Sequence, residues 1–318
     1  MSPELVWTAM FCLVAGCSGP SGHGQSTTPT NPRDEPERIR ITDDVRQLHL
    51  GTYFNVLVHT SEGVVVIDPT SDAAAEHTVE MIRESAPDQP LLAIIYSHWH
   101  LDHATGANVL RRAFGTDVPI IAHERVNLRL DEFMGRGAEN VPRPTQLLGD
   151  GPTELTFGDK TIELTYVGHA HSDNMLIARI QPDDVLYACD FVQNRSVGYS
   201  DLPGVDMHEQ IAMLYRVMEL DYTHTAFCHT PPGDRTAIEA YTRYFESLWD
   251  AVSQAIADGL DADATVLQTS EGLSQYRGWL RADEWLATNI RGMHRWLSEN
   301  PNATRPEGPT PIPPATSR

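Results

Sequence analysis

One short string of metal-binding side chains constrains this chain more than any other feature. The residues S-H-W-H-L-D-H directly follow a β-rich run, Leu91 to Tyr96, and supply His98, His100, Asp102 and His103. In an extended segment the first two histidines point to the same side, where their imidazoles can share one metal ion. The aspartate and the third histidine fall where the chain turns into a helix, within reach of a second ion. Imidazole together with carboxylate suits Zn²⁺, and also Fe or Mn.

Four further strings with the same types of side chain lie at the ends of other predicted strands. They are V-V-V-I-D-P with Asp68, G-H-A-H-S-D-N with His169 and His171, V-L-Y-A-C-D with Asp190, and F-C-H-T-P-P-G-D with His229. The order of all five strings and their placement at strand ends resemble the metallo-β-lactamase superfamily, over roughly residues 56–252.

This resemblance implies an α/β fold, a four-layer αββα sandwich with a dinuclear metal site at one edge between the sheets. It implies two zinc ions per chain, with Asp68 bracing the metal loop rather than binding metal. The implied ligands are His98, His100 and His171 for metal 1, and Asp102, His103 and His229 for metal 2, with Asp190 bridging both.

Two histidines compete for the ligand position in the third string. We favour His171 as the ligand, because the S-D-N-M-L that follows it runs straight into a strand, as the family pattern does. His169 then supports the site from outside the ligand set or has a structural role.

The predicted function is a zinc-dependent hydrolase that acts on a small molecule. A hydroxide shared by the two ions attacks a carbonyl or ester-type substrate such as a β-lactam, lactone or thioester, because zinc lowers the pKa of its bound water. Asp102 is the predicted catalytic residue, since it helps to orient this nucleophile. Two alternatives stay open. One is a mononuclear iron oxidoreductase resembling the persulfide dioxygenases, and the other is a binding protein with a metal site and no turnover.

The charge of the chain excludes one class of partner. The 23 basic and 44 acidic residues give a formal charge of −21, and Lys160 is the only lysine. Proteins that grip nucleic acid need clustered basic side chains, so no nucleic-acid partner is expected.

The two ends of the chain are predicted to lie outside the folded domain. Residues 1–16 contain an uncharged apolar stretch of the length of a signal peptide, and L-V-A-G-C resembles a bacterial lipobox in which Cys17 is lipidated. Residues 17–37 read as a flexible tether, residues 38–299 as one domain, and residues 300–318 as a proline-rich tail. We therefore expect an exported lipoprotein on the periplasmic or outer-membrane side, whose only membrane contact is the lipid on Cys17.

Cys189 and Cys228 each precede a predicted ligand. Because side chains alternate along a strand, both thiols are expected to point away from the metals and to be buried. A disulfide between them is the alternative, since an exported chain meets an oxidising compartment.

The string E-R-V-N-L-R-L-D-E and the pair Asp183–Asp184 are interpreted as solvated faces.

Overall fold

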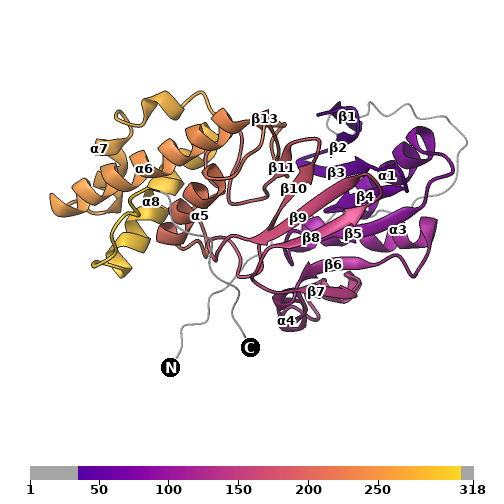
Figure 1. The fold of residues 1–318 in the computed structure, drawn as a ribbon. Helices are drawn as coiled ribbons and strands as arrows, with labels where there is room; N and C mark the ends of the chain where they lie inside the picture. The colour runs from indigo at the N-terminus through magenta and orange to yellow at the C-terminus, as the bar shows by residue number, and fades with distance from the viewer. Residues whose placement is uncertain (1–34, 309–318) are drawn as a thin grey trace, which may run out of the picture.

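Two β-sheets packed face to face form the centre of the protein, and helices cover the outer face of each sheet (Figure 1). The computed structural model describes residues 35–308. The predicted signal peptide, Cys17, most of the tether and residues 309–318 lie outside the described part. Among residues 35–308, no helix combines the length and the apolar character needed to cross a membrane.

The first sheet has its strands side by side in chain order. They are β1 (Glu37–Arg40), β2 (Val45–Leu50), β3 (Tyr53–His59), β4 (Val64–Ile67), β5 (Leu91–Ile95), β6 (Ile120–His123) and β7 (Gln146–Leu148). The strands from β4 to β7 are parallel, so their carboxyl ends lie at one edge of the sheet.

The second sheet has the spatial order β13-β12-β11-β10-β9-β8. Its strands are β8 (Thr153–Phe157), β9 (Lys160–Tyr166), β10 (Leu176–Gln181), β11 (Val185–Tyr187), β12 (His224–Ala226) and β13 (Gly233–Asp234). The neighbouring strands β11 and β12 are parallel.

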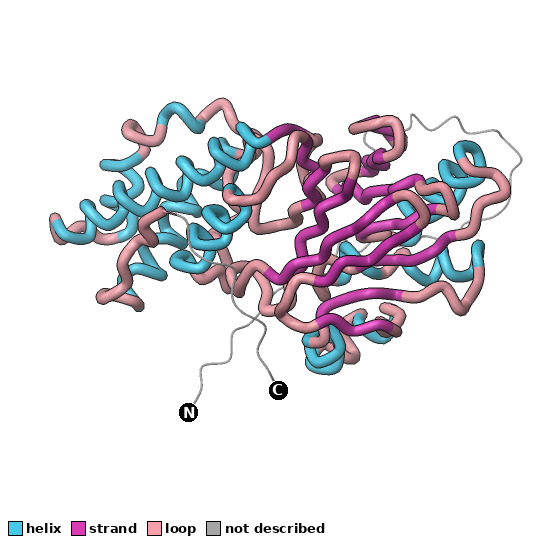
Figure 2. Tube along the Cα trace, viewed as in Figure 1, coloured by secondary structure: helices cyan, strands magenta, loops and turns pink. Residues whose placement is uncertain are grey.

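Three apolar clusters show that the helices and sheets form four layers. One packs α1 (Asp72–Ser85) and α3 (Ala107–Phe114) on the first sheet, and a second packs α5 (Met207–Met218), α6 (Arg235–Ala257) and α8 (Ala282–Glu299) on the second sheet. The third fills the space between the sheets. Figure 2 shows the strands in the middle of the molecule and the main helices at its two sides. The predicted αββα sandwich is therefore confirmed.

Strand β4 shows why its sequence reads as an unbroken apolar run. Val64 and Val66 pack toward α1, whereas Val65 and Ile67 pack between the sheets, and all four are buried. A strand buried on both faces has no solvent side on which polar residues would alternate. Ser71 then caps α1, because its Oγ accepts a hydrogen bond from the Ala74 N–H at 3.3 Å.

The two predicted solvated faces are each only partly exposed to solvent. E-R-V-N-L-R-L-D-E forms all of α4 (Arg125–Glu132) and its N-cap residue, and Val126 and Leu130 of this helix are buried in the core. Asp183 has only 8% of its side chain exposed, and its Oδ2 lies 2.8 Å from Nζ of Lys160. In both cases, side chains that look solvated from their neighbours in the sequence are covered by a residue distant in the sequence. That residue is an opposite charge in one case and an apolar side chain in the other.

The other helices are α2 (Leu101–Ala104) and α7 (Ala262–Thr269), with single turns at Ala138–Asn140 and Ser274–Tyr276.

Candidate metal centre

All seven predicted metal ligands follow the carboxyl ends of strands or lie in the short helix α2. His98 and His100 come after β5, Asp102 and His103 lie in α2, His171 follows β9, Asp190 follows β11, and His229 follows β12. Because these strand ends meet at one edge between the two sheets, the structure brings the seven side chains together.

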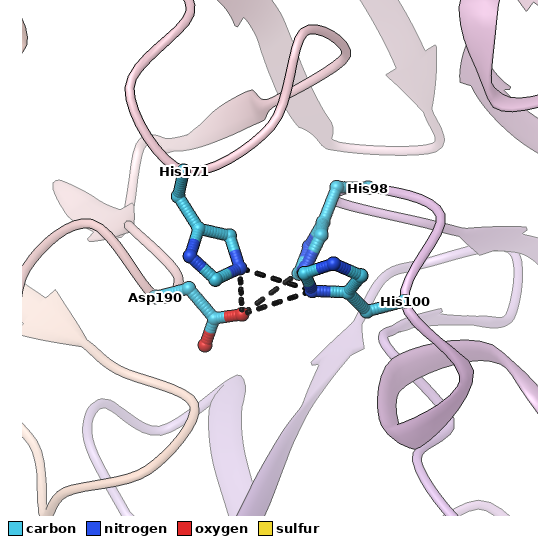
Figure 3. Close-up of side chains that lie close together, drawn as sticks. All are labelled: His98, His100, His171 and Asp190. Carbon is cyan, nitrogen blue, oxygen red and sulfur yellow. Dashed lines mark hydrogen bonds and ion pairs between the residues drawn. The ribbon is translucent and has the colours of Figure 1, made fainter. Parts of the chain in front are cut away.

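The first group of donor atoms joins three imidazoles and one carboxylate (Figure 3). Nδ1 of His100 lies 2.8 Å from Nε2 of His98 and 2.9 Å from Nε2 of His171. Oδ2 of Asp190 lies 3.1 Å from Nε2 of His98 and 3.0 Å from Nε2 of His171. The four donor atoms all lie within 4.8 Å of one another.

The chemistry of this group fits a metal ion. Burial lowers the pKa of His98 and of His100, so both imidazoles favour the neutral form. A neutral imidazole has one ring nitrogen with a free lone pair. Where such nitrogens lie close together, a bound cation stabilises the arrangement by accepting their lone pairs. Three imidazole nitrogens and one carboxylate oxygen form a donor set that Zn²⁺ accepts in tetrahedral geometry.

A second group of donor atoms lies on the other side of Asp190. Oδ2 of Asp102 is 3.5 Å from Nε2 of His103 and 3.7 Å from Nε2 of His229. Oδ1 of Asp190 is 3.0 Å from Nε2 of His229, and its Oδ2 is 3.4 Å from Nε2 of His103. The two oxygens of one carboxylate therefore face both groups, which is the arrangement that a bridging ligand needs.

Asp190 is held ionised at this position. Burial alone would raise the pKa of its carboxyl, but His103, His171 and His229 hold that pKa well below its ordinary value. The ionised form is the one that coordinates a metal.

Asp68 supports the metal loop and belongs to neither donor group among the described residues. Its Oδ1 accepts from the Ser97 backbone N–H at 2.7 Å, and its Oδ2 accepts from Ser97 Oγ at 2.6 Å and from the Tyr187 hydroxyl at 2.6 Å. Its Oδ2 also lies 3.3 Å from Nδ1 of His103. The Asp68 carboxylate thus holds Ser97, the residue before His98, and also contacts the imidazole of His103.

His171, and not His169, lies in the first donor group. Gly168 precedes His171 in the same turn and has a positive φ of 131°. A Cβ atom added at this position would lie 2.5 Å from Nη1 of Arg216. Only glycine fits there, and the turn directs His171 toward the metal centre. His169 is exposed and lines the neighbouring cavity.

Two arginines of α4 hold the segment after His171, and sequence reasoning missed them. Arg129 donates from Nε and Nη2 to both oxygens of Asp173, at 3.0 and 2.6 Å. Arg125 donates to the Asp173 carbonyl at 2.9 Å and also contacts both oxygens of Asp150. The spacing of these arginines, one helical turn apart, is the signal in the sequence, but nothing in it identifies their partners.

The expectation that both thiols point away from the metal centre is wrong. Sγ of Cys189 lies 3.6 Å from Nδ1 of His103, and Sγ of Cys228 lies 3.0 Å from Oδ1 of Asp190. Strands β11 and β12 end before these cysteines, so the alternation of a strand does not extend to them. Both are buried free thiols, as the simpler interpretation of the sequence predicts, and their burial raises the pKa of each.

A cavity of about 610 Å³ opens beside the two donor groups. This volume is within the range of about 300–1,000 Å³ that is typical of small-molecule sites. Its lining includes Trp99, Phe133, Tyr199, Leu280 and Trp285, together with the guanidinium-bearing residues Arg129 and Arg281. Trp285 therefore faces the cavity, one of the two roles that the sequence left open for the C-terminal tryptophans.

Several residues around the centre and the cavity have unusual backbone conformations. Asp68, Asp190, Leu202 and Arg281 have positive φ angles of 51°, 56°, 56° and 62°. This region is costly for a residue with a side chain, and bulky leucine is rarely found there. Strained residues of this kind concentrate at functional sites, where the surrounding structure holds them in place.

Known proteins match both the sequence and the fold. Residues 51–258 match the family profile of the metallo-beta-lactamase superfamily. The chain is 27% identical over 241 residues to the 2,4-dinitroanisole O-demethylase subunit alpha of Nocardioides sp. (strain JS1661), which covers 73% of this chain. The match spans 66% of that protein, just under two thirds of its length.

Solved structures share the fold at low sequence identity. A metallo-beta-lactamase from Pontibacter korlensis has a TM-score of 0.56 at 18% identity and covers 67% of this chain and 99% of its own. The inverting sec-alkylsulfatase Pisa1 from Pseudomonas sp. has a TM-score of 0.65 at 15% identity, covering 82% of this chain and 50% of its own. The family profile spans more than half of the sequence, and the fold agrees with it. The chain belongs to the metallo-beta-lactamase superfamily.

Proposed function

We propose that this protein is a hydrolase that binds two zinc ions per chain and cleaves a small carbonyl or ester-type substrate. The observation that carries the proposal is the convergence of two donor groups on the two oxygens of Asp190. We assign His98, His100 and His171 to one zinc ion and Asp102, His103 and His229 to the other. When bound, zinc would polarise the substrate and supply water with a pKa of roughly 7.

The role of Asp102 follows from its position between the donor groups and the cavity. Its side chain is 39% exposed and lines the cavity, whereas that of His103 is fully buried. Its carboxylate can therefore accept a hydrogen bond from a water molecule that approaches a substrate in the cavity. Such a contact orients the attacking water and holds the proton that it must lose. We assign Asp102 as the catalytic residue on this basis.

The second donor group favours the dinuclear hydrolase over the mononuclear iron alternative. A mononuclear site needs only one group of ligands, whereas Nε2 of His103 and Nε2 of His229 here lie 3.5 and 3.7 Å from Oδ2 of Asp102. The second alternative is a binding protein with a metal site and no turnover. The exposure of Asp102 to the cavity favours turnover, because a small molecule there reaches a carboxylate that can act on an attacking water.

We propose a substrate with an ester-type bond, and the names of two similar proteins suggest which substrate classes to test. One is named as acting on 2,4-dinitroanisole and one as an alkylsulfatase, so the bond cleaved here need not be that of a β-lactam. We propose no nucleic-acid partner, and a membrane contact only through lipid on Cys17.

The test is a panel of chromogenic substrates with the purified protein. It comprises a β-lactam, a lactone, a thioester, aryl esters, a sulfate ester and 2,4-dinitroanisole, and oxygen uptake on a persulfide is measured in parallel. We expect hydrolysis of at least one member with no oxygen uptake. Oxygen consumption on the persulfide without hydrolysis would contradict the proposal.

Asp102→Asn tests the catalytic assignment with little change in shape. We expect the rate to fall by about 100-fold or more, because a positioned general base contributes roughly 10²–10⁴-fold. The matched control is Asp88→Asn, an exposed aspartate before β5, at the end of that strand away from the metal centre, which should keep the full rate. Equal rates in the two variants would remove Asp102 from the mechanism.

A further inference from the structure

The wall of the cavity beyond the metal centre is made of aromatic and apolar side chains that solvent reaches. Tyr199 is 60% exposed and Leu280 is 51% exposed, although both are large and apolar. The Tyr199 ring meets the Trp285 ring edge to face, with centroids 4.9 Å apart. Exposed apolar groups that gather in a cavity are typical of a ligand-binding surface.

Hydrogen bonds join this wall to the loop that follows Asp190. Leu280 forms a strand-like bridge with Ser196, and its N–H donates to the Arg195 carbonyl at 2.8 Å. From α8, the Asn289 amide donates to the carbonyls of Gly198 and Ser200, on either side of Tyr199, at 2.9 and 2.6 Å. The apolar wall and the bridging aspartate therefore belong to one connected unit.

One positively charged side chain of this wall, Arg281, has only a weak ion-pair partner. The Arg281 guanidinium lies over the Trp285 ring, 4.6 Å from its centroid. Among residues 35–308, its ion-pair partner is the exposed Glu284 alone, at 3.3 Å. An exposed pair of this kind is worth little, so the charge stays available to a ligand. Arg129, the other arginine of the cavity, is engaged by both oxygens of Asp173.

We propose that Tyr199, Trp285 and Arg281 form a subsite for an aromatic ring that carries an anionic substituent. The rings of Tyr199 and Trp285 pack against the ring of the substrate, and Arg281 pairs with its negative group. Arg281 matters because the chain carries a charge of −21, which otherwise repels anions. The inference rests on the proposed function, since it names the substrate class of the same cavity.

Three probes separate the aromatic from the charge contribution. They are 2-naphthoate, its saturated counterpart decahydronaphthalene-2-carboxylate, and the neutral 2-naphthamide. Binding to the full chain, purified with its metals, is measured by isothermal titration calorimetry. We expect 2-naphthoate to bind most tightly and the other two probes to bind several-fold more weakly.

Variants assign each contribution to a side chain. Arg281→Met should weaken 2-naphthoate by about tenfold and leave 2-naphthamide unchanged, because only the anion uses the guanidinium. Trp285→Leu and Tyr199→Leu should each weaken both aromatic probes by about fivefold. Tyr199 is mostly exposed, so its variant remains informative if Trp285→Leu does not fold.

Matched controls outside the cavity are Arg277→Met and Leu267→Ala, which should leave all three affinities unchanged. The subsite is overturned if 2-naphthoate does not bind at millimolar concentration, if the saturated acid binds equally well, or if no cavity variant changes the affinities. Zinc content and hydrolysis are measured on the same preparations. Loss of the subsite with zinc and hydrolysis intact refutes only this inference, whereas absence of zinc or hydrolysis with the naphthoate pattern intact refutes only the proposed function.

Discussion

At the scale of single residues, the centre depends on the conformation of Asp190. It has a positive φ of 56°, and its carboxylate lies between the two donor groups, with Oδ2 near His171 of the first and Oδ1 near His229 of the second. Aspartate tolerates this region better than most residues, because its short side chain can form local hydrogen bonds. The backbone N–H of Asp190 is itself 3.1 Å from Sγ of Cys228. This local packing fixes the side chain that lies between both donor groups.

The histidine pair of the third string gives the sharpest test at this scale. We predict that His171→Ala loses one of two zinc ions, because it removes a donor of the first group. His169→Ala should keep both ions, because that side chain lies outside the group. Metal analysis of the two purified variants decides the matter, and the reverse pattern would show that the third-string ligand is His169.

The positions of the donor side chains and the burial of the two thiols were predictable from the sequence, but the direction of the thiols was not. Histidines and aspartates at strand ends are readable because parallel strands finish at one edge of a sheet. The direction of Cys189 depends on where β11 ends, two residues earlier, and on the turn at Asp190. Local alternation carries no information about such a turn.

At the scale of elements, α4 positions the loop that carries His171. Arg129 binds Asp173 through two parallel hydrogen bonds, and Asn174 accepts from the Trp99 N–H at 3.0 Å, which ties this loop to the one carrying His98 and His100. The sequence placed these arginines on a solvated face, since Asp173, the partner that they share, is more than 40 residues away. Contacts of that kind come from the packing of the two sheets.

We predict that Arg129→Met lowers zinc affinity by about 10- to 100-fold, the usual cost of losing a residue that orients a ligand. Arg129→Lys should retain more of the zinc affinity than Arg129→Met but less than the wild type, because an ammonium cannot bind both carboxylate oxygens as a guanidinium does. The exposed Arg112→Met is the matched control. Affinity is measured by competition with a chromophoric chelator, and an unchanged value for Arg129→Met would contradict the positioning role.

At the scale of the whole molecule, Lys160 links the two sheets at the end of β9 away from His171. Its side chain is 4% exposed, and Nζ lies 2.6 Å from Oδ2 of Asp44 and 2.8 Å from Oδ2 of Asp183. Asp44 precedes β2 of the first sheet, whereas Asp183 lies between β10 and β11 of the second. The four layers were predictable from the order of strands and helices, but this link was not.

Removing this lysine should destabilise the fold without touching the metal centre. We predict that Lys160→Met lowers the free energy of unfolding by about 3 kcal/mol, because it leaves the buried Asp183 carboxylate without its cation. The double variant Lys160→Met/Asp183→Asn should recover most of the loss. Urea denaturation at constant zinc concentration measures both, and a single variant as stable as the wild type would show that the pair contributes nothing.

The location of the molecule depends on a segment outside residues 35–308. We predict that Cys17 carries lipid and tethers the domain to a membrane. Cys17→Ser should release the protein from the membrane fraction while the wild type stays bound, as judged by fractionation and mass spectrometry. A wild-type protein that is already free of the membrane and retains Met1 would refute the lipoprotein prediction.

The central claim is that the seven convergent side chains hold two zinc ions. Metal analysis of the purified wild-type chain by inductively coupled plasma mass spectrometry tests it most directly. The two donor groups on Asp190 predict close to two zinc ions per chain. A single iron ion per chain, or no bound metal after growth in zinc-containing medium, would contradict it.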